Sequence, residues 1–65
     1  MLAGQALADG RYADAARLYR EAVRGEPGKT ELHYGLAVAS SYLDLRDDAI
    51  REFRWVLQYG PPNAA

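Results

Sequence analysis

The sequence predicts an all-α protein built from antiparallel helix–turn–helix hairpins. Alanine is abundant and isoleucine, valine and threonine are scarce, a composition that favours helices over strands. Glycine, proline and aspartate divide the chain into four segments, most of which carry apolar residues at spacings of three and four. The chain also resembles itself when it is shifted so that Leu2 falls on Leu36, which indicates a repeated helical hairpin.

The first two helices are expected at residues 2–8 and from Tyr12 to about Arg24. The first is short, and Asp9-Gly10 ends it. Asp14 near the start of the second helix and Arg24 near its end suit the helix dipole. Gly25-Glu26-Pro27-Gly28 then stops it. Its apolar stripe consists of Tyr12, Ala15, Ala16, Tyr19, Ala22 and Val23.

The third helix is expected to begin with Thr30 as its N-terminal cap, and a turn at residues 44–46 ends it. The fourth runs from about Asp47 to Tyr59, because Gly60 and Pro61-Pro62 cannot continue a helix. The third helix carries the stripe Leu32, Leu36, Ala39 and Leu43. The expected inner face of the fourth consists of Ala49, Ile50, Phe53, Val56 and Leu57.

The internal repeat is the strongest signal in the sequence. The shift aligns 31 pairs, and seven of these are identical. The identical pairs are Leu2 and Leu36, Ala3 and Ala37, Asp14 and Asp48, Ala15 and Ala49, Arg17 and Arg51, Arg20 and Arg54, and Pro27 and Pro61. The leucine and alanine pairs fall on the expected inner faces and the proline pair ends each unit, so the two units should share one fold.

This 34-residue pattern resembles the tetratricopeptide (TPR) family. The second unit carries the family's Leu-small, Ala, aromatic, small and Pro positions as Leu36-Ala37, Ala49, Phe53, Val56 and Pro61. The resemblance implies a short right-handed α-solenoid in one domain of residues 1–65. That domain would hold a truncated first repeat (1–29), a second repeat (30–63) and a tail (60–65). His33 replaces the family's Trp, Ser40 its Tyr and Asp44 its turn glycine.

The resemblance also implies a non-catalytic protein–protein interaction module that holds a peptide or helix in a concave groove. The first helix of each hairpin would line that groove. The chaperone-tail-binding subgroup has asparagines where this chain has Gly4 and Gly35, so a hydrophobic ligand is expected instead. In the alternative interpretation, Tyr34 and Tyr42 only pack against neighbouring repeats. The expected groove residues are Leu7, Glu31, Tyr34, Val38, Ser41 and Tyr42.

Trp55 lies outside the apolar stripe of its helix, and Arg51 could cover its ring. With Tyr59 it could instead form an apolar end patch, an interface for a further helix. The sequence leaves these two interpretations open.

Arginines recur on the second and fourth helices and could form a basic binding stripe. Acidic residues lie three or four positions from most of them, as Asp47 lies four before Arg51. Local ion pairs on a solvated face are therefore the preferred interpretation.

The chemistry of the chain argues against an enzyme. It has one histidine, His33, and no cysteine, and no base–nucleophile or metal-ligand spacing occurs, so no cofactor or metal is expected. A net charge of −1 gives no reason to expect nucleic acid, and no apolar run could span a membrane. The start of the chain does not resemble a signal peptide, so a cytoplasmic location is expected.

The predicted array holds fewer than two full repeats, although about three are usually needed for a stable core. We therefore expect either neighbouring repeats or self-association. A scaffold module with a peptide groove is the first functional hypothesis. The second is a small structural or chaperone-like subunit that folds as an obligate homo- or hetero-oligomer.

Overall fold

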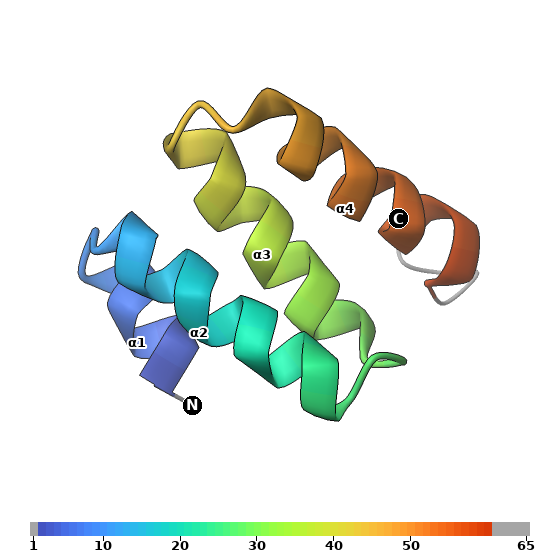
Figure 1. Cartoon of the computed structure of the whole chain (residues 1–65), viewed down its shortest axis with the longest axis horizontal. Coiled ribbons are helices and arrows are strands. Elements are labelled where there is room, and N and C mark those ends of the chain that lie inside the picture. Colours follow the sequence, from blue (N-terminus) through green and yellow to red (C-terminus); the bar gives the residue numbers. More distant parts are fainter. Residues whose placement is uncertain (1, 61–65) are drawn as a thin grey trace.

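The computed structural model describes residues 2–60 and confirms the predicted all-α fold within that part of the chain. The helices are α1 (Leu2–Ala8), α2 (Tyr12–Gly25), α3 (Thr30–Tyr42) and α4 (Arg46–Tyr59). Each packs on the next in antiparallel order, and α1 also contacts α3, so that α1–α2 and α3–α4 form two stacked hairpins (Figure 1). The predicted stop at Pro61-Pro62 and the tail lie outside the described residues.

The two hairpin turns occupy equivalent positions in the two units and have the same hydrogen-bonded geometry. After α1, the Arg11 amide donates to the Ala6 carbonyl at 2.9 Å, and Gly10 between them has a φ of +79°. After α3, the Leu45 amide donates to the Ser40 carbonyl at 2.9 Å, and the intervening Asp44 has a φ of +60°. This is the Schellman termination, in which one residue takes the left-handed conformation. The equal geometry supports the 34-residue register, with Asp44 taking the place of a glycine.

Two helix starts differ from the sequence prediction. Lys29 occupies the cap position of α3, and no side chain caps the helix, so the prediction that Thr30 is the cap is wrong. Thr30 is instead the first helical residue. The fourth helix begins one residue earlier than expected, at Arg46, because the Schellman turn at its N-terminal side closes by Leu45.

The core is made mostly of small residues, which lets the helices approach closely. Tyr19 is the largest buried side chain among the core residues and fills the space between α2 and α3. Alanine provides most of the other contacts because it has no side-chain bulk to separate the helix axes. The buried core cluster consists of Ala3, Ala6, Ala15, Ala16, Tyr19, Leu32, Leu36 and Ala39.

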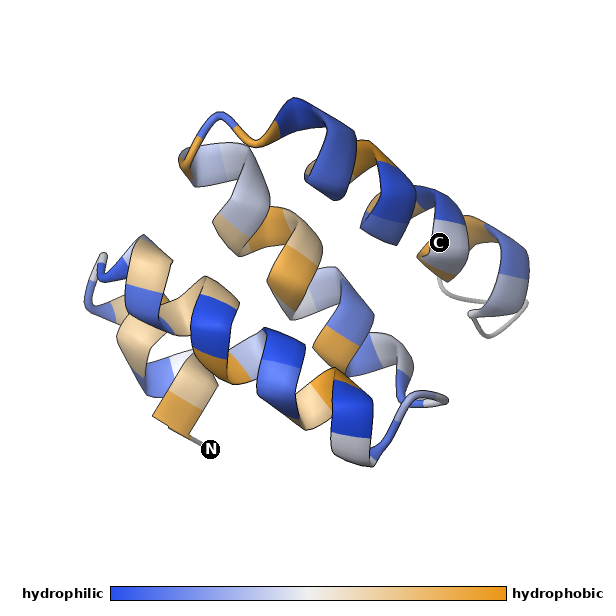
Figure 2. Cartoon of the chain, in the orientation of Figure 1, coloured by the Kyte–Doolittle hydropathy of each residue, from blue (hydrophilic) through white to orange (hydrophobic). Residues whose placement is uncertain are grey.

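The expected inner face of α4 is only partly covered. Ala49 is buried, and Phe53 and Val56 are half-buried. Ile50 remains 46% exposed and Leu57 87% exposed, so their assignment to the buried face is wrong. The physical reason is that α4 is the last helix of the described stack and has a neighbour on one side alone. In Figure 2, short apolar segments alternate with hydrophilic turns along α4.

Candidate functional site

The side of α3 that faces away from the core carries the predicted groove residues of the second unit. Tyr34, Val38, Ser41 and Tyr42 recur at spacings of three and four, so they share one face of the helix. Glu31 begins the same face one turn earlier. Tyr34 is 54% exposed and Tyr42 is 63% exposed, while Val38 between them is half-buried. The structure therefore brings these residues onto one open face.

Leu7, the groove residue predicted from the first unit, lies on α1. It is half-buried and packs against the core cluster. Only part of its side chain is accessible, so α3 supplies most of the accessible apolar area of this face.

Each of the two exposed tyrosines is supported by one aromatic neighbour from another helix. The Tyr34 ring meets the Phe53 ring of α4 edge-on, with centroids 5.9 Å apart. The Tyr42 ring stacks on the Tyr12 ring of α2, with centroids 4.3 Å apart and planes 8° apart. Aromatic pairs of this kind contribute about 0.5–1.5 kcal/mol beyond the area they bury. The two rings are therefore held in place while one side of each stays in solvent.

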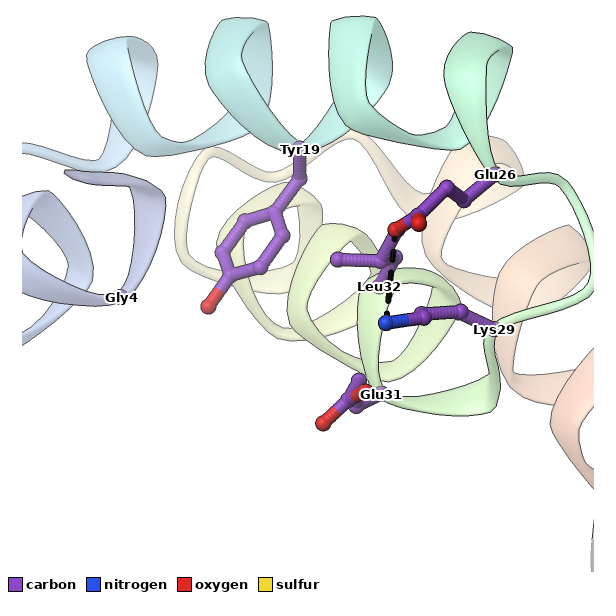
Figure 3. Close-up of a pocket in the computed structure, with 6 residues that line it drawn as sticks. All are labelled: Gly4, Tyr19, Glu26, Lys29, Glu31 and Leu32. Atoms are coloured by element: carbon purple, nitrogen blue, oxygen red, sulfur yellow. Dashed lines mark ion pairs between the residues drawn. The ribbon is translucent and has the colours of Figure 1, made fainter. Parts of the chain in front are cut away.

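A surface pocket of about 330 Å³ lies near the start of α3. Figure 3 shows the Tyr19 ring reaching from α2 into this region between Gly4 of α1 and Leu32 of α3. The Tyr19 hydroxyl lies near Gly4, where an added Cβ would stand 3.7 Å from it. Charged residues line the rest of the pocket: Glu31, and the ion pair of Lys29 with Glu26 at 3.5 Å.

The close approach of α2 and α3 depends on Gly35. A Cβ placed on Gly35 would collide with ring atoms of Tyr19, since the ring lies directly against the glycine backbone. Gly35 therefore determines how deeply Tyr19 inserts between the helices. Through Tyr19 it also determines the shape of the pocket beside Gly4.

His33 is a packed residue that joins three segments. Its Nδ1 lies 2.6 Å from Glu52 Oε1 on α4, and its Nε2 lies 2.7 Å from the Pro27 carbonyl oxygen in the α2–α3 loop. The Pro27 carbonyl oxygen can only accept a hydrogen bond, so Nε2 donates in that contact. The ring also stacks on Trp55, with centroids 3.7 Å apart. These contacts fix α4 and the loop against α3, in the place where the family has a Trp.

Trp55 is half-buried by this stack, so His33 and not Arg51 covers its ring. Tyr59 lies beside it with centroids 5.3 Å apart and is 63% exposed. The two residues are adjacent, as the predicted end patch requires. Tyr59 provides most of its accessible surface.

Two of the exposed arginines pair locally. Arg17 lies 3.9 Å from Asp14, and Arg51 lies 2.7 Å from Asp48. The spacing in the sequence suggests Asp47 as the partner of Arg51, and the structure corrects this to Asp48, one turn before the arginine. Such exposed pairs contribute little to stability, roughly 0–1 kcal/mol each.

Within residues 2–60, no group of three histidine, cysteine, aspartate or glutamate side chains gathers as a metal site would require. None of the helices in this part of the chain combines the length and apolarity that a membrane crossing needs.

Stacked antiparallel hairpins with matching turns at equivalent positions define a helical-repeat protein, a class that binds partners through extended surfaces. The family model described as "Tetratricopeptide repeat" matches residues 6–65, and the chain belongs to the tetratricopeptide repeat family. Membership indicates a protein–protein interaction module. No curated protein and no solved structure matches the chain.

Sequence reasoning missed three contributions to this region. The pairing of His33 with Glu52 joins two different helices, and periodicity carries no information on such a pair. The insertion of Tyr19 against Gly35 and the stack of Tyr12 on Tyr42 likewise depend on how α2 crosses α3. One signal was available for Gly35, since a glycine within a helix often marks a close approach.

Proposed function

We propose that this chain is a non-catalytic interaction module that binds an apolar peptide or helix along the exposed face of α3 and α1. Residues 1–29 and 30–63 would act as its two repeats, and a cytoplasmic location belongs to the same proposal. The observation that carries it is the pair of exposed tyrosines on α3, each supported by a ring from a neighbouring helix.

The support under these rings matters because binding must overcome the entropy lost when side chains become ordered. Immobilising a mobile side chain costs about 0.5–1.5 kcal/mol. Tyr34 and Tyr42 already rest on Phe53 and Tyr12, so a ligand meets rings that are largely ordered. Their free faces offer apolar contact and their hydroxyls offer hydrogen bonds, the combination that makes tyrosine common at interfaces.

The chemistry of the face favours an apolar segment with few charges. Val38 lies between the two tyrosines, and Glu31 is the one carboxylate among the α3 groove residues. The groove residues include no lysine or arginine that could hold a carboxylate by an ion pair. A ligand with apolar side chains at helical or extended spacing, and a basic group near Glu31, fits this arrangement best.

The test is selection of peptides from a random display library, followed by fluorescence-polarisation titration of the selected peptide. Tyr34→Ala and Tyr42→Ala are each expected to weaken its affinity about tenfold or more, because buried aromatic anchors dominate binding energy. Circular dichroism checks that each variant keeps its helical content.

Tyr59→Ala is the matched control, because Tyr59 is as exposed as Tyr42 but lies at the end of α4 beside Trp55. It is expected to bind like the parent chain. Equal affinity of the parent, Tyr34→Ala and Tyr42→Ala would show that the α3 face is not the binding site. Failure of the library to yield any binder would contradict the proposal as a whole.

A further inference from the structure

One side of α4 carries an apolar face that the described residues cover only in part: Phe53 packs against Tyr34, while Ile50 and Leu57 are exposed. Ile50, Phe53 and Leu57 follow one another at spacings of three and four, the pattern of a seam between two helices. Leu57 is 87% exposed and projects as the most exposed of the large apolar side chains in this part of the chain. A partner that covers Leu57 must have a cavity that receives this projecting side chain.

The same face of α4 contains such a cavity. A cleft of about 240 Å³ lies where the start of α4 meets the end of α3. The α4 residues that line this cleft precede Leu57 by seven to eight positions on average. At a rise of about 1.5 Å per residue, the cleft therefore lies about 11 Å from Leu57 along the helix axis. The lining residues are Ser41, Asp44, Arg46, Ala49, Ile50 and Phe53.

A projecting residue and a cleft on one helix face complement each other across a two-fold axis. If α4 pairs with the α4 of a second copy in antiparallel orientation, an axis near residues 51–52 places each Leu57 opposite Arg46, which lines the cleft of the other copy. Ile50 then lies opposite Phe53 of the second copy, and the contact is repeated by symmetry. Two-fold contacts of this type close on themselves and are the commonest in soluble oligomers.

The charges beside the apolar face select the antiparallel orientation. Asp47 and Arg54 are both exposed and lie two turns apart on the same flank of α4. In the antiparallel pair, Asp47 and Arg54 of the second copy lie on the same flank and about 3 Å apart along the helix axis, within reach of the long arginine side chain, and the reciprocal pair forms as well. A parallel pair would place Asp47 level with Asp47 and Arg54 level with Arg54 of the second copy, so neither residue would meet an opposite charge.

We infer that this face of α4 binds a second copy of this chain, giving a two-fold dimer with Ile50 and Phe53 at its centre and a Leu57 anchor on either side. This interface goes beyond the proposed peptide-binding face. Tyr42 and Tyr12 lie on the α2 side of α3 and take no part in it. The two faces adjoin at Phe53, which supports Tyr34, and at Ser41, a groove residue that also lines the cleft. A dimer would therefore carry two peptide-binding faces.

The test is sedimentation equilibrium of the purified chain over a range of concentrations up to about 100 µM, where an interface of even micromolar affinity is filled. The expected mass is that of a dimer, twice the 7.2 kDa of one chain. Leu57→Arg is expected to give a monomer, and because Leu57 is so exposed, the helical content should stay unchanged.

Charge reversal then tests the orientation. Asp47→Arg is expected to raise the dimer dissociation constant about tenfold, since it places two pairs of like charges in contact. Adding Arg54→Asp in the same chain restores both ion pairs with opposite polarity and should return the constant to within about threefold of the parent. Glu21→Arg, the same charge change on exposed α2, is the control and should leave it unchanged.

A monomer at the highest concentration would overturn the inference and would indicate that the α4 face binds a helix other than a second copy of this chain. A dimer that survives Leu57→Arg would also overturn it, because the contact would then lie elsewhere. Failure of Arg54→Asp to rescue Asp47→Arg would reject the antiparallel pairing. None of these results depends on peptide binding, so each is separate from the test of the α3 face.

Discussion

Gly35→Ala is expected to destabilise the protein, although alanine is the better helix former. In an exposed helix interior this change would raise the free energy of unfolding by about 1 kcal/mol. Here the new methyl group would overlap the Tyr19 ring, which is buried between α2 and α3. Overpacking of a core costs about 1–3 kcal/mol.

Because the overlap involves three atoms of a rigid ring, the cost should lie at the upper end of that range. Subtracting the gain in helix propensity leaves a net loss of about 2 kcal/mol. For a domain of this size, that loss corresponds to a fall in Tm of about 8–16 °C. Urea and thermal unfolding followed by circular dichroism measure both quantities, at one fixed protein concentration so that association does not contribute.

Gly4→Ala is the matched control for this experiment. Its new Cβ would meet the same tyrosine at its hydroxyl, 3.7 Å away, which is an ordinary van der Waals contact. Gly4→Ala should therefore raise the free energy of unfolding, by up to about 1 kcal/mol. Tyr19→Leu should relieve the overlap, so Gly35→Ala combined with Tyr19→Leu should cost at least about 1 kcal/mol less than the sum of the two single changes. If Gly35→Ala instead stabilised the chain as Gly4→Ala does, the Tyr19 ring could not lie against Gly35.

Three further expectations concern single side chains and are measured by the same unfolding experiments. The Ser40 hydroxyl is buried and has no hydrogen-bond partner among the described residues, so Ser40→Ala should raise the free energy of unfolding by about 1 kcal/mol, and a loss would indicate a bound partner. Asp44→Gly should leave the free energy of unfolding unchanged or raise it by up to about 1 kcal/mol, because glycine takes a φ of +60° without strain. Gly10→Ala should lower the free energy of unfolding by about 1 kcal/mol, because alanine is strained at a positive φ. A stabilising Gly10→Ala together with a destabilising Asp44→Gly would contradict the turn geometry. Glu52→Ala should lower the free energy of unfolding by about 2 kcal/mol, because it leaves a buried ring nitrogen of His33 without its partner. Glu52→Gln should lower it by less, because an acceptor oxygen remains. Equal losses in the two variants would show that the hydrogen bond does not contribute to stability.

The positions of the helices could be predicted because their signals are local. Gly10 and Gly25 mark the ends of α1 and α2, and the apolar stripe of α2 follows a period that requires no partner to be recognised. The prediction failed at the cap of α3, where Thr30 has the right side chain but lies one residue inside the helix. The choice between two adjacent positions depends on the loop that enters the helix, and local composition does not resolve it.

The predicted groove residues of α3 share a face because helical periodicity places them there, and this much required no tertiary information. The partners of Tyr34 and Tyr42 could not be predicted, because Phe53 and Tyr12 come from helices whose crossing angles depend on the whole core. That this face binds a ligand stays a proposal, since periodicity places side chains on a face without determining what they contact.

The amino-acid sequence by itself determined the helical class, the 34-residue repeat and the face of each helix that is apolar. These properties depend on backbone propensity and on spacing along one helix, which are local quantities. Only the tertiary structure decided which apolar faces are covered. Ile50 and Leu57 follow the same periodic pattern as Ala49, yet α3 covers Ala49 and leaves the other two largely exposed. Burial is a property of pairs of helices, and a periodic pattern shows that a face needs a neighbour without showing whether it has one.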